Sequence, residues 1–106
     1  MSSAIRDLKP SALWNRFADL NEIPRPSKHE EAVCAWLLQW AEDQGLEAWQ
    51  DDVKNVFIKK PATPGMEDRQ TVVLQSHVDM VCQKNNDTEF DFMTEGIKMY
   101  VDGDWV

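Results

Sequence analysis

Apolar residues recur at three- and four-residue steps in two stretches of the first half of the chain. Residues 11–20 and 28–44 each carry such a stripe, with polar residues between its members, and this spacing is typical of amphipathic helices. The first helix is expected to begin at Ser11, after Pro10, and to end before Pro24, because a residue that precedes proline resists the α conformation. Its stripe consists of Leu13, Trp14, Phe17, Ala18 and Leu20.

The second predicted helix, residues 28–44, has a signal at each end. Ser27 precedes it and Glu30 follows three residues later, which is the spacing of a capping box. Gly45 comes directly after the stripe, where a left-handed residue commonly closes a helix. The stripe consists of Val33, Trp36, Leu37, Trp40 and Ala41. These signals predict a helix that packs one face against a core.

Three shorter apolar runs predict strands. Residues 46–50 alternate in polarity like a half-buried strand, and residues 56–58 form a second, more apolar one. Residues 71–74, Thr-Val-Val-Leu, are apolar or β-branched throughout, so we expect a strand buried on both faces. The order helix, helix, strand, strand, strand predicts an α/β fold in which two helices pack on a sheet.

The remaining segments are predicted to be irregular. Residues 1–9 have no apolar period and should form a polar lead-in, and residues 61–70 are a surface loop rich in turn residues and charges. Asp102-Gly103 is a tight-turn dipeptide, so residues 104–106 would begin the returning strand of a hairpin. A domain rarely ends on a half-made hairpin, and we therefore expect the sequence to be part of a longer domain.

Composition limits the classes of function. The 106 residues are enough for one small domain. Lys and Arg number 11 and Asp and Glu 19, a net charge of −8, which argues against nucleic acid or an anionic membrane as a partner. No apolar run approaches the roughly 20 residues of a membrane span, and the amino terminus has no apolar signal core. With only Cys34 and Cys82, no disulfide framework is expected, and the predicted location is cytoplasmic.

A histidine and an aspartate stand two residues apart shortly after the run 71–74. In an extended backbone His77 and Asp79 would point to the same side, at the carboxyl end of the predicted strand, where α/β sheets place ligand sites. Imidazole is a good zinc ligand, and a neighbouring carboxylate can ligate the metal, orient the ring or polarise a bound water. A strand end with two unrelated polar residues has the same pattern. The other histidine, His29, falls in a first helical turn and is expected to be an exposed surface residue.

Four stretches of the chain resemble the zinc-dependent metallopeptidase family M20. They are Ile23-Pro24-Arg25-Pro26-Ser27 with the following Glu30 and Glu31, residues 59–67, residues 74–81 and residues 83–87. The His-Val-Asp-Met segment is common to the wider family. The Lys-Pro-Ala-Thr loop and the Gln-Lys-Asn-Asn run are narrower and indicate its aminoacyl-histidine dipeptidase subgroup. The resemblance extends over nearly the whole chain, from about Leu13 to Val106.

The resemblance implies a zinc site built from more than this chain. Residues 1–106 would be the amino-terminal portion of an α/β catalytic domain, followed by the rest of that domain and a lid or dimerisation domain. Two zinc ions are implied, with other divalent metals as substitutes. His77 matches the first histidine ligand, and Asp79 matches the carboxylate that lies beside the metals and supports the ligand set. The bridging aspartate, the glutamate general base, a further carboxylate and a distal histidine are expected beyond residue 106.

Hydrolysis of small peptides, including dipeptides with carboxy-terminal histidine, is the activity that the resemblance implies for the longer protein. The 106-residue chain alone is expected to be inactive. Another M20 peptidase or an amide deacylase would show the same His-x-Asp pattern. A different class of protein, a non-catalytic α/β interaction domain, would use His77 and Asp79 only to pair with each other. Exposed apolar surface on the chain should also favour self-association through open sheet edges.

Overall fold

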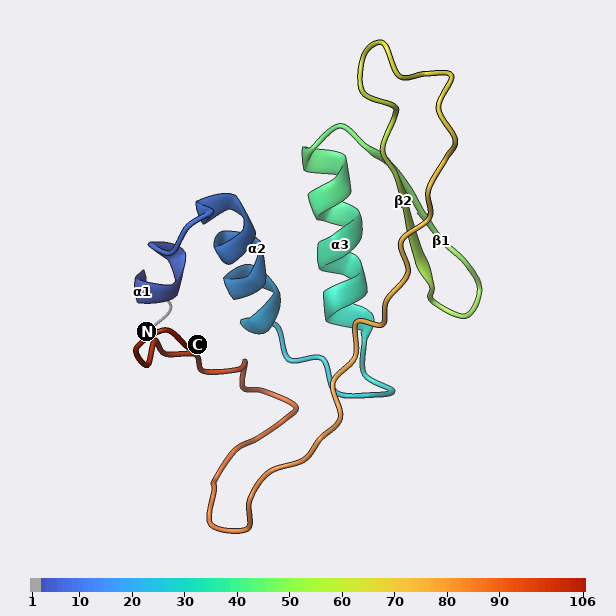
Figure 1. Cartoon of the computed structure of the whole chain (residues 1–106). Helices are drawn as coiled ribbons and strands as arrows, with labels where there is room; N and C mark the ends of the chain where they lie inside the picture. Colours follow the sequence, from blue (N-terminus) through green and yellow to red (C-terminus); the bar gives the residue numbers. More distant parts are fainter. Residues whose placement is uncertain (1–2) are drawn as a thin grey trace. The chain divides into compact units, whose positions relative to one another are not determined.

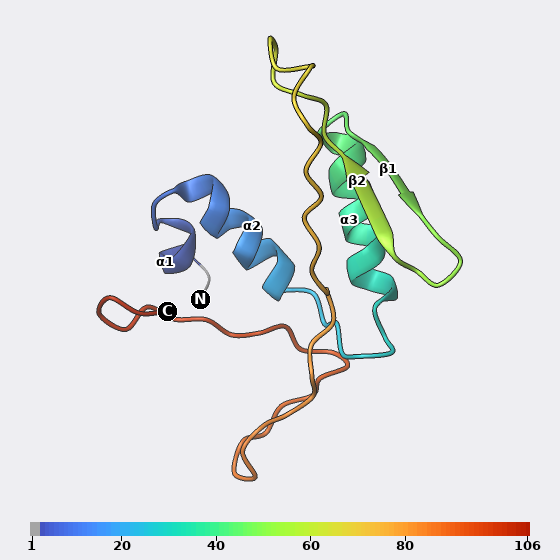
Figure 2. The same cartoon turned by 45° about the vertical axis from the view of Figure 1, so that its right-hand side comes forward.

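The structure, a computed structural model, describes residues 3–106 and divides into two compact units. One unit contains the chain up to Val33 together with Asp79–Val106, and the other is Cys34–Val78. Figures 1 and 2 show the helices and strands of both units. Each unit is held together by its own contacts, and the boundary between them lies inside the segment predicted to carry the site.

The first unit begins with two helices, α1 (Ser3–Arg6) and α2 (Ser11–Asn21). The predicted start of α2 is confirmed: Pro10 has extended dihedral angles of −74° and 132°, and the helix begins at the next residue. At the other end the Glu22 amide donates to the Ala18 carbonyl at 3.1 Å, and the chain leaves the helix before Pro24, as predicted.

Helix α1 contradicts the prediction of an irregular lead-in, as far as residues 3–6 are concerned; residues 1 and 2 lie outside the described part. Ile5 is fully buried. Arg6 forms ion pairs with Asp19 at 2.7 Å and with Glu22 at 3.1 Å, both on or directly after α2. A four-residue helix is too short to be stable alone. Packing against α2 therefore stabilises α1, and four residues carry no period from which it could be predicted.

The segment 91–99 packs on the carboxyl-terminal end of α2. The Ile97 amide donates to the Asn21 carbonyl at 2.7 Å, and the Asn21 side-chain amide donates to the sulfur of Met99 at 3.1 Å. Asn21 is only 3% exposed. Gly96 permits this close approach, because a Cβ there would lie 2.7 Å from the Asn21 carbonyl oxygen. A residue without a side chain is therefore required at this position.

Helix α3 (Glu31–Asp43) confirms the second predicted helix but begins three residues later than predicted. Lys28 has a φ of 77°, which is left-handed and cannot belong to an α-helix. Its amide donates to Oε1 of Glu30 at 2.8 Å, while the hydroxyl of Ser27 is engaged elsewhere. The predicted capping box is therefore wrong: Ser27 does not cap this helix.

The carboxyl-terminal end of α3 has the predicted glycine closure. Gly45 has a φ of 71°, and its amide donates to the Glu42 carbonyl at 2.9 Å. The Leu46 amide reaches back to the Ala41 carbonyl at 2.8 Å, which completes a Schellman motif. Because glycine takes a left-handed conformation without steric cost, the chain can turn directly from the helix into the first strand.

Two strands form the sheet of the second unit, β1 (Glu47–Gln50) and β2 (Val56–Lys59), and both were predicted. They pair antiparallel with Trp49 opposite Phe57. The two rings stack with centroids 5.3 Å apart and planes inclined by 6°. Helix α3 lies along this hairpin in both views (Figures 1 and 2). The predicted α/β class, helices with a small sheet, is confirmed.

The third predicted strand, residues 71–74, is wrong. No strand is assigned there among the described residues, and Val72, Val73 and Leu74 are 78%, 84% and 92% exposed. A strand buried on both faces needs neighbours that pair with its backbone and layers that cover its side chains. The sheet of this unit consists of β1 and β2, which pair with each other. The apolar run therefore has neither partner nor cover within its unit.

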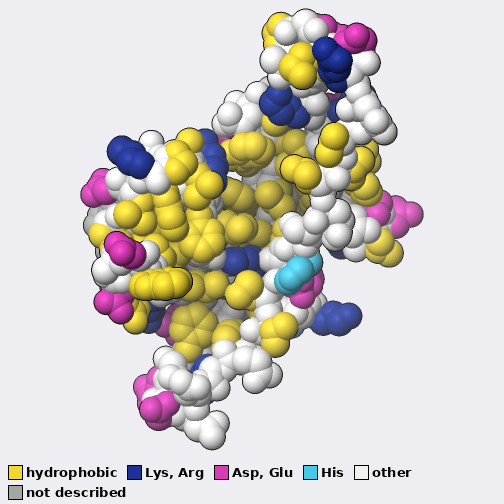
Figure 3. All heavy atoms as spheres, viewed as in Figure 1, with side chains coloured by type: hydrophobic (Ala, Val, Ile, Leu, Met, Phe, Trp, Pro, Cys, Tyr) yellow, Lys and Arg dark blue, Asp and Glu magenta, His cyan; other side chains and the backbone are white. Residues whose placement is uncertain are grey.

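Hydrophobic side chains are also exposed in the first unit. In Figure 3 they occupy much of the visible surface. The most exposed large ones are Trp105 at 79%, Tyr100 at 73% and Val81 at 68%. This confirms the prediction of exposed apolar surface. Within the described residues, no helix is both long and apolar enough to cross a membrane.

Candidate functional site

His77 lies in the exposed, irregular segment that follows the apolar run. It belongs to the second unit, whereas Asp79 is the first residue of the returning part of the first unit. No strand carries His77, so its predicted place at a strand end is wrong. His77 is an exposed residue. The shared orientation predicted for His77 and Asp79 stays a prediction.

Asp79 is half-buried and is held by a residue far away in sequence. The Ser27 hydroxyl donates to Oδ2 of Asp79 at 2.5 Å, across 52 positions of the chain. The same hydroxyl lies 3.4 Å from the Met80 carbonyl oxygen. A hydroxyl–carboxylate bond of this length is a charge-assisted one, and such bonds are among the stronger hydrogen bonds in proteins. Asp79 is thus oriented by the segment that leads from α2 to α3.

The backbone beside Asp79 is fixed to the same segment by a short parallel bridge between Pro26 and Met80. The Met80 amide donates to the Arg25 carbonyl at 2.9 Å, and the Ser27 amide donates to the Met80 carbonyl at 3.2 Å. Both bonds come from the neighbours of Pro26, so the missing N–H of that proline removes nothing from the pairing. The connection between α2 and α3, which contains Pro24 and Pro26, therefore pairs with the backbone beside Asp79.

Arg25 anchors this connection to the end of α2. It is 8% exposed, and its guanidinium donates to the Leu20 carbonyl and to Oδ1 of Asn21, each at 2.9 Å. Burial lowers the pKa of Arg25 because it disfavours the charged form. The cation lies at the carboxyl-terminal end of α2, where the helix dipole favours positive charge. Arg25 therefore joins the helix to the segment that holds Asp79.

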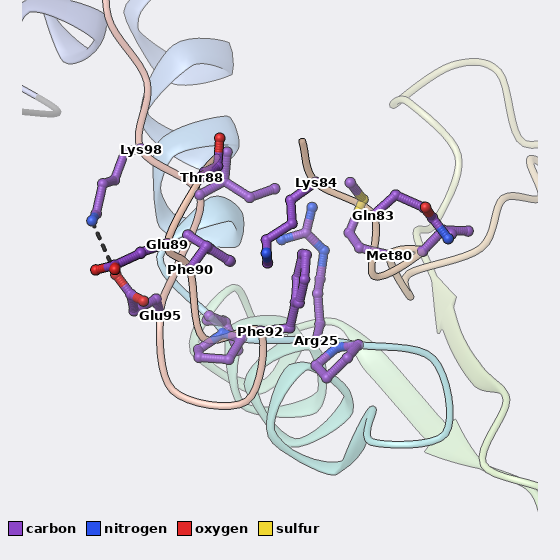
Figure 4. A pocket seen from close by; sticks show the side chains of 15 residues that line it. Arg25, Met80, Gln83, Lys84, Thr88, Glu89, Phe90, Phe92, Glu95 and Lys98 are labelled. Atoms are coloured by element: carbon purple, nitrogen blue, oxygen red, sulfur yellow. Dashed lines mark hydrogen bonds and ion pairs between the residues drawn. The ribbon is translucent and has the colours of Figure 1, made fainter. Parts of the chain in front are cut away.

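A cavity of about 460 Å³ lies beside this connection (Figure 4). Its walls come from residues 23–26 and from the segment 80–98, with Phe90 and Phe92 among the lining side chains. Lys98 and Glu95, which also line it, form an ion pair at 3.0 Å. No histidine, cysteine or aspartate is among its lining residues. The cavity therefore offers no metal ligand of its own beyond glutamates.

The donor chemistry around residue 77 fits part of a zinc site. Imidazole and carboxylate are the ligand types that zinc prefers alongside thiolate. Among the described residues, however, no three His, Cys, Asp or Glu side chains come together in a group that could hold a metal ion. The residue types at positions 77 and 79 therefore suit such a site, but the described residues do not gather a complete ligand set.

The interpretation of the sequence missed one residue of this arrangement. Ser27 was interpreted as a helix cap, whereas its hydroxyl binds Asp79. The signal that could have pointed to it is its place in the Ile-Pro-Arg-Pro-Ser stretch, one of the stretches that carry the family resemblance. A serine followed by glutamate three residues later is typical of a capping box. This local pattern gives no indication that the serine side chain binds the distant Asp79.

Comparisons with known proteins bear on this arrangement. No family model matches the chain. The chain is 49% identical over 104 residues to a protein of Escherichia coli (strain K12) named cytosol non-specific dipeptidase, a match that covers 98% of the chain and 21% of that protein. It is also similar to the crystal structure of aminoacylhistidine dipeptidase from Vibrio alginolyticus, with a TM-score of 0.88 and 52% identity over 93% of the chain.

The chain spans about a fifth of the length of both proteins: 21% of the first and 20% of the second. At 52% identity and a TM-score of 0.88, the fold of the chain is that of the corresponding part of an aminoacylhistidine dipeptidase. The resemblance to dipeptidases of this kind, predicted from the sequence, is confirmed.

Proposed function

We propose that this chain is the amino-terminal part of the catalytic domain of a metal-dependent dipeptidase, and that the longer protein hydrolyses dipeptides, including those with carboxy-terminal histidine. The observation that carries the proposal is the match to two dipeptidases at 49% and 52% identity. The first match takes in 104 of the 106 residues and so includes His77, Asp79 and Ser27. Both relatives are hydrolases by name.

His77 is the residue that would bind zinc, and Asp79 would support the ligands beside it. Bound zinc lowers the pKa of a coordinated water to about 7, which provides a nucleophile at neutral pH. Catalytic zinc is usually held by three protein ligands and one open position. Because the described residues gather no such set, the other ligands and the general base would come from outside residues 3–106.

Substitutions at the two residues test the proposal in the full-length protein. The measurement is release of free histidine from an Xaa-His dipeptide in the presence of zinc or manganese. His77→Ala should remove a ligand and abolish most of the activity. Asp79→Ala should lower activity about 10–100-fold, the usual effect of losing a partner that supports metal ligands.

Two exposed residues of the same types are matched controls, His29 and Asp87. His29→Ala and Asp87→Ala should leave the rate within about twofold of wild type, because exposed substitutions away from a site change little. A full-length His77→Ala protein at the wild-type rate would refute the assignment of the ligand. A wild-type protein without chelator-sensitive hydrolysis would refute the proposed activity and would favour the non-catalytic interaction domain.

The range of substrates that the full-length protein hydrolyses distinguishes a dipeptidase from another M20 peptidase or an amide deacylase. The Escherichia coli relative is named a non-specific dipeptidase, whereas the Vibrio alginolyticus one is named for aminoacylhistidine substrates. We infer a dipeptidase that accepts dipeptides without histidine as well. A panel of Xaa-His dipeptides, other dipeptides, tripeptides and N-acyl amino acids tests this. Faster hydrolysis of tripeptides or N-acyl amino acids would indicate another M20 peptidase or an amide deacylase instead.

A cytosolic location and small peptides as partners complete the proposal. The name of the Escherichia coli relative supports the location. The net charge of −8 supports the expectation that nucleic acids and anionic membranes are not partners. Fractionation of cells that express a tagged full-length protein tests the location, and recovery in the membrane fraction would contradict it.

A further inference from the structure

The bond between Ser27 and Asp79 joins two residues that local structure alone would not bring together. The Ser27 hydroxyl donates to Oδ2 of Asp79 at 2.5 Å. We infer that Ser27 is a positioning residue, which holds the Asp79 carboxylate in one orientation and thereby tunes the metal site. The inference rests on the proposed function and extends it to a residue outside the His-x-Asp motif.

The backbone of Ser27 is held in place by its own amide and by the residue before it. Its amide donates to the Met80 carbonyl at 3.2 Å, directly beside the carboxylate that its side chain binds. Pro26, the residue before it, has a fixed φ and is buried. The Ser27 hydroxyl has two acceptors within reach, Oδ2 of Asp79 at 2.5 Å and the Met80 carbonyl oxygen at 3.4 Å. The shorter contact is to the carboxylate, so the Asp79 carboxylate meets a donor on a backbone that is itself paired with its neighbour.

This segment is fixed in turn to α2. The Arg25 carbonyl accepts the Met80 amide, and the Arg25 guanidinium binds the Leu20 carbonyl and the Asn21 side chain. A chain of short hydrogen bonds therefore runs from the end of α2 to the Asp79 carboxylate. Groups that support metal ligands work through such fixed orientation, because a carboxylate that turns freely spends less time in the productive geometry.

The alternative, a purely local role for Ser27, does not fit the geometry. A helix cap would accept a hydrogen bond from a backbone amide two or three residues further on. The Ser27 hydroxyl instead donates to Asp79 Oδ2, and the left-handed Lys28 separates Ser27 from α3. The hydroxyl is thus directed at the carboxylate and not at the helix that follows.

The test uses the full-length protein and three variants at these positions: Ser27→Ala, Ser27→Thr and the Ser27→Ala/Asp79→Ala double variant, with Asp79→Ala as the reference. Zinc affinity is measured by competition with a chelator, without substrate, and kcat and KM are measured with an Xaa-His dipeptide. Thermal unfolding of the metal-free proteins reports on the fold. Ser11→Ala, the same chemical change at an exposed serine, is the matched control.

Ser27→Ala should weaken zinc binding and lower kcat about tenfold each, the lower end of the range for a lost supporting partner, with little change in KM. Ser27→Thr keeps the hydroxyl and should restore both. In the Asp79→Ala background, removing the serine should change zinc affinity less than about twofold, because coupled residues are not additive.

Three results would overturn the inference. The first is wild-type zinc affinity in Ser27→Ala. The second is equal losses in Ser27→Ala and Ser27→Thr that track the unfolding temperature of the metal-free protein. The third is a full, additive effect of Ser27→Ala on zinc affinity when Asp79 is already alanine. Because zinc affinity is measured without substrate, it decides the role of Ser27 even if the wild-type protein hydrolyses no dipeptide, which would refute only the proposed activity.

Discussion

Gly96→Ala is expected to weaken the packing of the segment 91–99 on the end of α2. A Cβ at this position would lie 2.7 Å from the carbonyl oxygens of Asn21 and Glu22 and 2.8 Å from the Glu22 carbonyl carbon. These distances are 0.6–0.7 Å shorter than the 3.4 Å at which ordinary contact begins. All three atoms belong to the backbone, so no flexible side chain can move aside.

The expected destabilisation follows from three contributions. Overpacking of a tight contact costs about 1–3 kcal/mol. The shift would also lengthen the 2.7 Å bond from the Ile97 amide to the Asn21 carbonyl, and a net hydrogen bond is worth about 1 kcal/mol. Replacing glycine by alanine restricts the unfolded chain and offsets about 0.4–1 kcal/mol. Together they give a local loss of stability of about 1–3.6 kcal/mol, which is about a 5- to 400-fold increase in opening.

Hydrogen exchange of the Ile97 amide in the full-length protein measures this opening directly. Gly96→Ala should speed its exchange by the factor given above. Thr94→Ala, at an exposed residue of the same segment, is the matched control and should leave the exchange rate of the Ile97 amide unchanged. Unchanged protection of Ile97 in Gly96→Ala would refute the claim that the close approach requires glycine. Equal acceleration in both variants would show that the segment is simply sensitive to substitution.

Two further predictions concern the second unit. The side-chain amide of Asn55 holds the pKa of the Asp51 carboxyl below its ordinary value of 3.8, with help from the backbone amides of the same loop. Because the pKa of Asp51 is lower in the folded chain, its ionised carboxylate stabilises the fold above pH 3.8, and this stabilisation is lost as the pH falls through the folded value. Asn55→Ala should raise the pKa of Asp51 in an NMR titration. An unchanged pKa of Asp51 would contradict this prediction. Leu74 is 92% exposed and should promote association of the 106-residue chain. Leu74→Lys should shift the sedimentation of this chain toward that of a monomer. Wild-type chains that sediment as monomers would contradict the prediction.

The spacing of apolar residues and the signals at helix ends predicted most of the regular structure, because both act over only a few residues. The stripe from Leu13 to Leu20 becomes α2, and Gly45 closes α3 with the dihedral angle that only glycine adopts freely. The two strands of the hairpin also lie where the alternating run 46–50 and the apolar run 56–58 predict them. In each case the neighbours that matter are neighbours in sequence, so a local pattern is sufficient evidence.

The predicted strand at residues 71–74 failed for the opposite reason. Its composition is that of a buried strand, but burial depends on partners and cover that a short run of residues does not contain. The same holds for α1, where a fully buried Ile5 and the ion pairs of Arg6 depend on α2. The residues of a segment set its conformational preference, and the tertiary contacts around it determine whether it adopts that conformation.

The candidate site also has a part that the sequence predicted and a part that only the structure shows. The prediction of His77 and Asp79 as site residues comes from the sequence, because their spacing and the residues around them resemble dipeptidases. The comparisons confirm that resemblance. Only the tertiary structure identified Ser27 as the partner of Asp79. The reason is physical. The spacing of a capping box is a local pattern, worth about 1 kcal/mol where such a cap forms. The bond to Asp79 joins residues 52 positions apart, in two segments that pair at the Pro26–Met80 bridge.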